Sequence, residues 1–123
     1  MPDARIDDPF ALHEGAADTW RFVRERVLEA GVVDRPVKEL ALAYVHDPDA
    51  IDVERHEGRE RAALDWAHAI VWDADAANDE LWERLHALFS EQELVELGCA
   101  VGFELGRTHF LRTLGADPHA TTP

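Results

Sequence analysis

The clearest helix of the chain lies in the stretch SEQELVELGCAVGFELGRTHFLRTLG, residues 90–115. Ser90 and Glu93 form a capping box, in which the serine hydroxyl accepts the amide of Glu93 and the glutamate reaches back to the serine amide. Gly115 is a typical helix stop, because glycine readily adopts the left-handed conformation that ends many helices. We therefore predict a helix that begins at Glu91 and fills this stretch to its last leucine.

Toward the N-terminus, apolar residues recur with the helical period, and no run alternates as a half-buried strand would. Prolines, glycines and capping side chains divide this part into four further helices. We expect them at residues 12–30, 36–47, 55–72 and 79–89, with Asn78 as the N-cap of the last one. Five helices joined by short loops predict an all-α, single-domain bundle.

The two ends of the chain differ in composition from the part between them. Residues 1–10 and residues 116–123 contain prolines and few apolar side chains. Such segments are typically loose unless something ties them down. We therefore expect a flexible N-terminal tail over 1–10, a helical domain over 11–115 and a flexible C-terminal tail over 116–123.

The charge of the chain excludes several classes of partner. Its 123 residues include 26 acidic and 12 basic side chains, which gives a net charge of −14 with histidine neutral. A surface of this sign repels phosphate groups, so we expect neither nucleic acid nor membrane partners. The polar start of the chain and the absence of an 18-residue apolar run predict no leader, no membrane span and a cytoplasmic location.

The residues that could carry chemistry are few. The single cysteine, Cys99, allows no internal disulfide and no zinc cluster of cysteines. Its apolar neighbours predict a small core residue with a poorly reactive thiol. The seven histidines include no pair at helical metal-ligand spacing, and Glu83 with His86 gives a Glu-x-x-His motif only once. We therefore predict no metal and no cofactor.

Three glycines, Gly98, Gly102 and Gly106, lie four residues apart in the last predicted helix and share one face of it. Each costs about 1 kcal/mol relative to alanine inside a helix, so the missing side chains should serve a purpose. One interpretation is a tight crossing with another helix of the same chain. The other is a close helix contact across an interface between subunits.

Several segments together resemble one known family. They are RERAALDWA at 59–67, NDELW at 78–82, FSEQELVEL at 89–97 and RTLG at 112–115, with a weaker match at 36–45. In this order they resemble the all-α alkylhydroperoxidase D-like, or carboxymuconolactone decarboxylase-like, proteins. The resemblance implies the helical fold expected above, and it implies assembly into homo-oligomers, which is common in that family.

The redox members of that family use a Cys-x-x-Cys pair at a helix N-terminus, a following histidine and an upstream glutamate. Glu39 matches the glutamate, but Ile51 and Glu54 occupy the positions of the two cysteines. Gly58 occupies the histidine position, although His56 is close to it. The resemblance therefore implies a degenerate member that has lost the redox pair.

Our leading hypothesis from the sequence is a homo-oligomeric scaffold or a protein that binds a small-molecule ligand or a partner. One alternative is a peroxidase-type, peroxiredoxin-like antioxidant enzyme that uses Cys99. Another is an acid–base lyase or isomerase in which Glu39 acts with His46 or His56. A further possibility is a heteromeric arrangement in which a full-length family partner supplies the cysteine pair.

Overall fold

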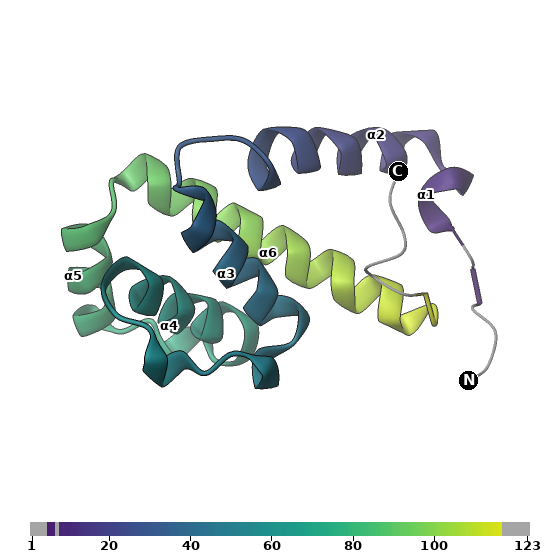
Figure 1. Ribbon diagram of the computed structural model, residues 1–123. Helices are drawn as coiled ribbons and strands as arrows, with labels where there is room; N and C mark the ends of the chain where they lie inside the picture. Colours follow the sequence, from purple (N-terminus) through teal and green to yellow (C-terminus); the bar gives the residue numbers. More distant parts are fainter. Residues whose placement is uncertain (1–4, 7, 117–123) are drawn as a thin grey trace.

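The structure is a computed structural model, and the residues described are 5, 6 and 8–116. These residues form helices and no strand, so the all-α class predicted from the sequence is confirmed. The α-helices are α1 (Pro9–Leu12), α2 (Glu14–Val23), α3 (Arg35–His46), α4 (Gly58–Trp72), α5 (Asp79–Leu88) and α6 (Glu91–Thr113) (Figure 1). None of these helices is long and apolar enough to cross a lipid bilayer.

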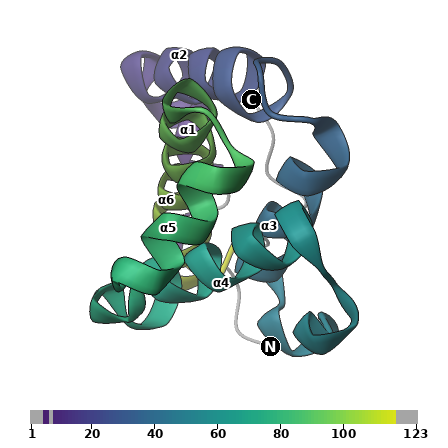
Figure 2. The ribbon, with the colours of Figure 1, turned by 90° about the vertical axis from the view of Figure 1, so that its left-hand side faces the viewer.

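Four helices, α3 to α6, enclose the hydrophobic core. Its innermost large side chains are Leu64, Leu85 and Leu97, which have no exposed surface. The helix α2 lies over the C-terminal half of α6, on the side away from α4 (Figures 1 and 2). We call residues 9–28 the arm: it consists of α1, α2 and a π-helical turn at Arg24–Leu28, and none of its described side chains belongs to the core cluster.

The first predicted helix, 12–30, is wrong in its extent. His13 has an extended backbone that separates α1 from α2, and its Nδ1 accepts the amide of Ala16 at 3.0 Å. A histidine at this position therefore acts as a helix cap, a role that periodicity alone does not reveal. The predicted boundary of the N-terminal tail at residue 10 falls inside α1. Apart from Ala116, the predicted C-terminal tail lies outside the described residues.

The segment between α3 and α4 also differs from the prediction. The helix expected from residue 55 begins at Gly58, and the residues before it form two short 3-10 turns, Pro48–Ala50 and Val53–Arg55. Gly58 has a φ of 60°, a left-handed value that glycine adopts readily, and this residue changes the direction of the chain between the second turn and α4. Ile51 follows the first turn and packs against the core, whereas Glu54 lies in the second turn and is exposed, and no α-helix begins at either residue.

The capping box that begins α6 is present as predicted. The amide of Glu93 donates to Ser90 Oγ at 3.1 Å, and the amide of Ser90 donates to Glu93 Oε1 at 2.9 Å. Asn78 likewise caps α5, with its Oδ1 accepting the amide of Leu81 at 3.0 Å. These local contacts set the start of both helices within the chain.

A buried ion pair fixes the connection between the arm and α3. Lys38 Nζ lies 3.0 Å from Glu96 Oε2 and also donates to the carbonyl oxygens of Val27 and Ala30. The Glu96 carboxylate occupies the space where a side chain at Gly31 would lie, and the φ of Gly31 is 121°. All three ammonium protons of the lysine therefore have acceptors, which marks this cluster as a structural joint.

Candidate functional site

A large groove lies between the arm and α6. Its volume is about 750 Å³, which is within the range of small-molecule sites, roughly 300–1,000 Å³. We call it the aromatic groove. Helical spacing places its lining on facing sides of α2 and α6. The lining residues are Phe10, His13, Gly15, Ala16, Thr19, Trp20, Gly102, Phe103, Gly106, Arg107 and Phe110.

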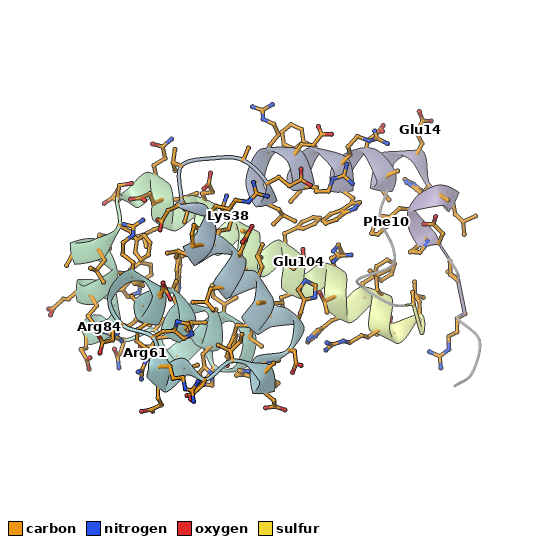
Figure 3. The ribbon with its side chains drawn as sticks, viewed as in Figure 1. Phe10, Glu14, Lys38, Arg61, Arg84 and Glu104 are labelled. Carbon is orange, nitrogen blue, oxygen red and sulfur yellow. The ribbon has the colours of Figure 1, made fainter. Side chains whose placement is uncertain are left out.

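Stacked rings form one wall of the aromatic groove. The Trp20 ring lies 5.4 Å from the Phe103 ring at an interplanar angle of 3°, and 6.2 Å from the Phe10 ring. Figure 3 shows Phe10 extending from α1 toward the space between α2 and α6. Trp20 is only 4% exposed, whereas Phe110 at the rim is 47% exposed. Aromatic contacts therefore help to hold α1 and α2 against α6.

The three glycines of α6 have different surroundings. A methyl group added at Gly98 would lie 2.9 Å from Trp66 Cη2, so this glycine permits a close approach within the chain. A methyl group at Gly102 or Gly106 would meet no heavy atom within 4 Å. The interpretation of all three as one tight intramolecular crossing is therefore wrong for Gly102 and Gly106, which leave the backbone of α6 open toward the aromatic groove.

A buried charged cluster lies beneath the aromatic groove. Glu104 is 3% exposed, and its Oε1 lies 3.3 Å from His46 Nε2 and accepts the Nε–H of Arg107 at 2.9 Å. The Arg107 guanidinium lies 4.5 Å from the centre of the Trp20 ring. Burial alone would raise the pKa of Glu104, but the hydrogen bonds from His46 and Arg107 outweigh it, so this pKa lies below its ordinary value.

Glu104 and Arg107 are not among the residues predicted from the sequence, although a usable pattern was present. The buried side chains of α6 follow a spacing of four and three residues: Leu97, Val101, Glu104, Thr108 and Leu111. A carboxylate at such a position needs a charged partner in the fold. Figure 3 shows Glu104 on the side of α6 that faces α3, the helix that carries His46.

The structure brings together two of the three predicted acid–base residues. Glu39 and His46 both line a second groove of about 460 Å³ along α3 and the turn that follows it. Glu39 is exposed and pairs with Arg35 at 2.8 Å, while the imidazole of His46 has its Nε2 toward the buried Glu104. His56 lies outside this groove and pairs with Glu60 at 2.7 Å.

Cys99 is exposed, so the prediction of a core position is wrong. Leu97 and Val101 lie on the opposite side of α6 and belong to the core cluster, and the apolar run around the cysteine concealed this difference. In the described part of the chain, no three His, Cys, Asp or Glu side chains are arranged to hold a metal ion.

Comparisons with known proteins gave no match to any protein-family model, to any curated protein or to any solved structure.

Proposed function

We propose that this chain is a non-redox helical binding protein and that the aromatic groove is its binding site. The observation that carries the proposal is a groove of about 750 Å³, walled by aromatic rings and floored by two glycines. Small-molecule sites are typically concave, mostly apolar and equipped with a few polar groups. We also keep as part of this proposal the resemblance to the alkylhydroperoxidase D-like proteins. A degenerate member of that family would keep the helical scaffold and lack the redox cysteine pair, as a binding protein could.

The binding proposal can be tested with indole as a probe, followed by NMR of the amide groups. We expect shifts at Trp20, Gly102 and Gly106, and we expect Gly106→Leu to abolish them because a leucine there fills the groove. His109→Leu is the matched control, since His109 is exposed on the same helix and does not line the groove. Shifts confined to other surfaces, or unchanged in Gly106→Leu, would contradict the proposal.

The non-redox part of the proposal rests on the isolation of the cysteine. Cys99 is exposed on α6, and the sequence offers no second cysteine to resolve an oxidised thiol. We expect no peroxide consumption with dithiol reductants, in the wild-type protein or in Cys99→Ser. Robust turnover that the substitution abolishes would support the peroxidase alternative.

An acid–base enzyme has weaker support. Glu39 and His46 share the second groove, but Glu104 holds the Nε2 side of the imidazole and the Nδ1 atom is buried. A catalytic base must reach the proton that it removes from a substrate. The ring nitrogens of His46 are directed into the protein, which is typical of a structural histidine.

Self-association is a second candidate function, and the distribution of charge favours it. Residues 29–103 contain eighteen acidic and six basic side chains, whereas residues 1–28 and 104–123 together contain eight and six. The segments that build the aromatic groove are therefore nearly neutral. Two copies of a chain with a charge of −14 repel each other least when they meet through this end.

Sedimentation velocity over a range of concentrations tests this second candidate. If copies meet through the groove, Phe110→Glu should shift the population toward the monomer, because it places a carboxylate on a half-exposed ring position. His109→Glu is the control for added charge on the same helix. A wild-type protein that remains monomeric at all concentrations would eliminate self-association.

A further inference from the structure

We propose that the aromatic groove takes an uncharged ligand that carries one or two flat aromatic ring systems. The inference rests on the proposed function, because it names the class of ligand for the same site. Three properties of the groove lead to it: the orientation of its rings, the form of its floor, and the pairing of its charges.

The rings of the groove favour a flat ligand. Phe103 and Trp20 are nearly parallel, and Phe10 is tilted by only 21° from Trp20, so the three rings form a stack with a common orientation. Phe10 and Phe103 are half-buried and keep part of their surface available. A planar molecule can continue such a stack through offset contacts with these rings.

The floor of the groove also suits a flat molecule. Gly102 and Gly106 lie about one helical turn apart on α6. A methyl group added at either position would meet no heavy atom within 4 Å, so the space above both glycines is open. A ligand can therefore approach the backbone of α6 closely over this turn. The volume of about 750 Å³ accommodates a compound with two flat ring systems without movement of the core.

The charges of the groove disfavour an ionised ligand. Arg107 is the only Asp, Glu, Lys or Arg among the described lining residues, and its guanidinium already pairs with Glu104. The Nδ1 of His13 accepts the Ala16 amide at 3.0 Å, so this nitrogen is already engaged within the arm. A charged ligand would lose hydration in the groove and would have to compete with an existing ion pair. An anion would in addition approach a chain of charge −14.

Two fluorescent probes that differ mainly in one sulfonate test this inference. N-phenyl-1-naphthylamine is uncharged, and 1-anilinonaphthalene-8-sulfonate has the same two ring systems with a negative charge. We expect the uncharged probe to bind at least about tenfold more tightly, a difference of about 1.4 kcal/mol. The preference should persist in 0.5 M NaCl, where the net charge of the chain acts over only about 4 Å.

Two variants of α6 test whether the uncharged probe binds in the aromatic groove. Gly106→Leu should abolish binding of the uncharged probe, and His109→Leu should leave it within about twofold of the wild type. Circular dichroism verifies that both variants fold. If Gly106→Leu does not fold, Phe110→Ala replaces it, and removal of this rim ring should weaken binding of the uncharged probe by about fivefold.

The possible results distinguish an error in the class of ligand from an error in the position of the binding site. Equal or tighter binding of the sulfonate in 0.5 M NaCl, blocked by Gly106→Leu, would overturn the uncharged class and leave the binding site in place. Binding of the uncharged probe that Gly106→Leu does not alter would overturn both the inference and the proposed function. A groove-dependent dimer that binds neither probe would identify a second copy as the occupant and refute the ligand class.

Discussion

Replacement of Trp20 by alanine should release the arm from α6 before it unfolds the rest of the protein. Trp20 is 4% exposed, and it contacts Phe103, Phe10 and the guanidinium of Arg107. The core cluster lies among α3 to α6 and includes no described residue of the arm. Trp20→Ala should therefore weaken the docking of the arm on α6 and leave the packing of the core cluster largely unchanged.

The magnitude follows from the surface that the indole ring buries. A buried tryptophan removes about 150–250 Å² from water, which at about 25 cal/mol/Å² corresponds to about 4–6 kcal/mol. The methyl group of alanine retains a small part of this burial, and the arm can relax toward α6. Measured costs of such replacements are about 3–5 kcal/mol, and we expect a loss of at least about 3 kcal/mol in the docking of the arm.

Limited proteolysis with trypsin measures this loss directly, because the arm contains Arg21, Arg24 and Arg26. When opening and closing are fast relative to cleavage, the rate follows the population of the open arm. A loss of about 3 kcal/mol should accelerate cleavage in the arm by about 100-fold. Circular dichroism should show that the α3 to α6 bundle keeps a cooperative transition.

Phe22→Ala is the matched control, because Phe22 lies on the same helix and is largely exposed. Its cleavage rate should change by less than about threefold, since surface substitutions usually alter stability by no more than about 0.5 kcal/mol. If Trp20→Ala is cleaved no faster than Phe22→Ala, the arm is not held by the Trp20 stack and the reasoning is refuted.

Three further predictions concern α6 and its partners. Gly102→Ala should increase the free energy of unfolding by up to about 1 kcal/mol and raise the thermal midpoint. Gly98→Ala should lower the midpoint, because its methyl group would meet the indole ring of Trp66. A shift of the midpoint in the same direction for both variants would contradict the different surroundings of the two glycines. Lys38→Met should cost about 3 kcal/mol in urea unfolding by leaving the Glu96 carboxylate without its cation, and adding Glu96→Gln should recover part of the loss. Burial raises the pKa values of Glu96 and Glu104, but their hydrogen bonds lower both below the ordinary value of 4.5. These groups therefore stabilise the fold above about pH 5, and stability should fall as the pH drops through 4.5 and below, as a pH series of unfolding midpoints would show.

The course of α6 could be predicted from the sequence because its ends are set by local contacts. The Ser90 and Glu93 bonds form within four residues, and Gly115 ends the helix through its own φ of 73°. The division of the first helix at His13 was missed, since the cap comes from a side chain whose cap role is rare.

Only part of the candidate site could be predicted from the sequence. The glycine spacing predicted a special face on α6, but whether another helix covers that face depends on where α2 and α4 lie. Gly98 meets Trp66 of α4, and Gly102 meets nothing within 4 Å. The burial of Glu104 follows from the buried spacing of α6, yet its partner His46 comes from a helix more than fifty residues earlier. Contacts of this range have no local pattern.

The sequence by itself determined the helical class, the starts of α5 and α6 and the excess of negative charge, because each depends on neighbouring residues or on composition. The tertiary structure decided which apolar faces meet. It placed Trp20 against Phe103, left Cys99 in solvent and opened a groove over two of the three glycines. The physical reason is that burial of apolar surface is non-directional, so many pairings satisfy a helical stripe and only the packing of the whole chain selects one.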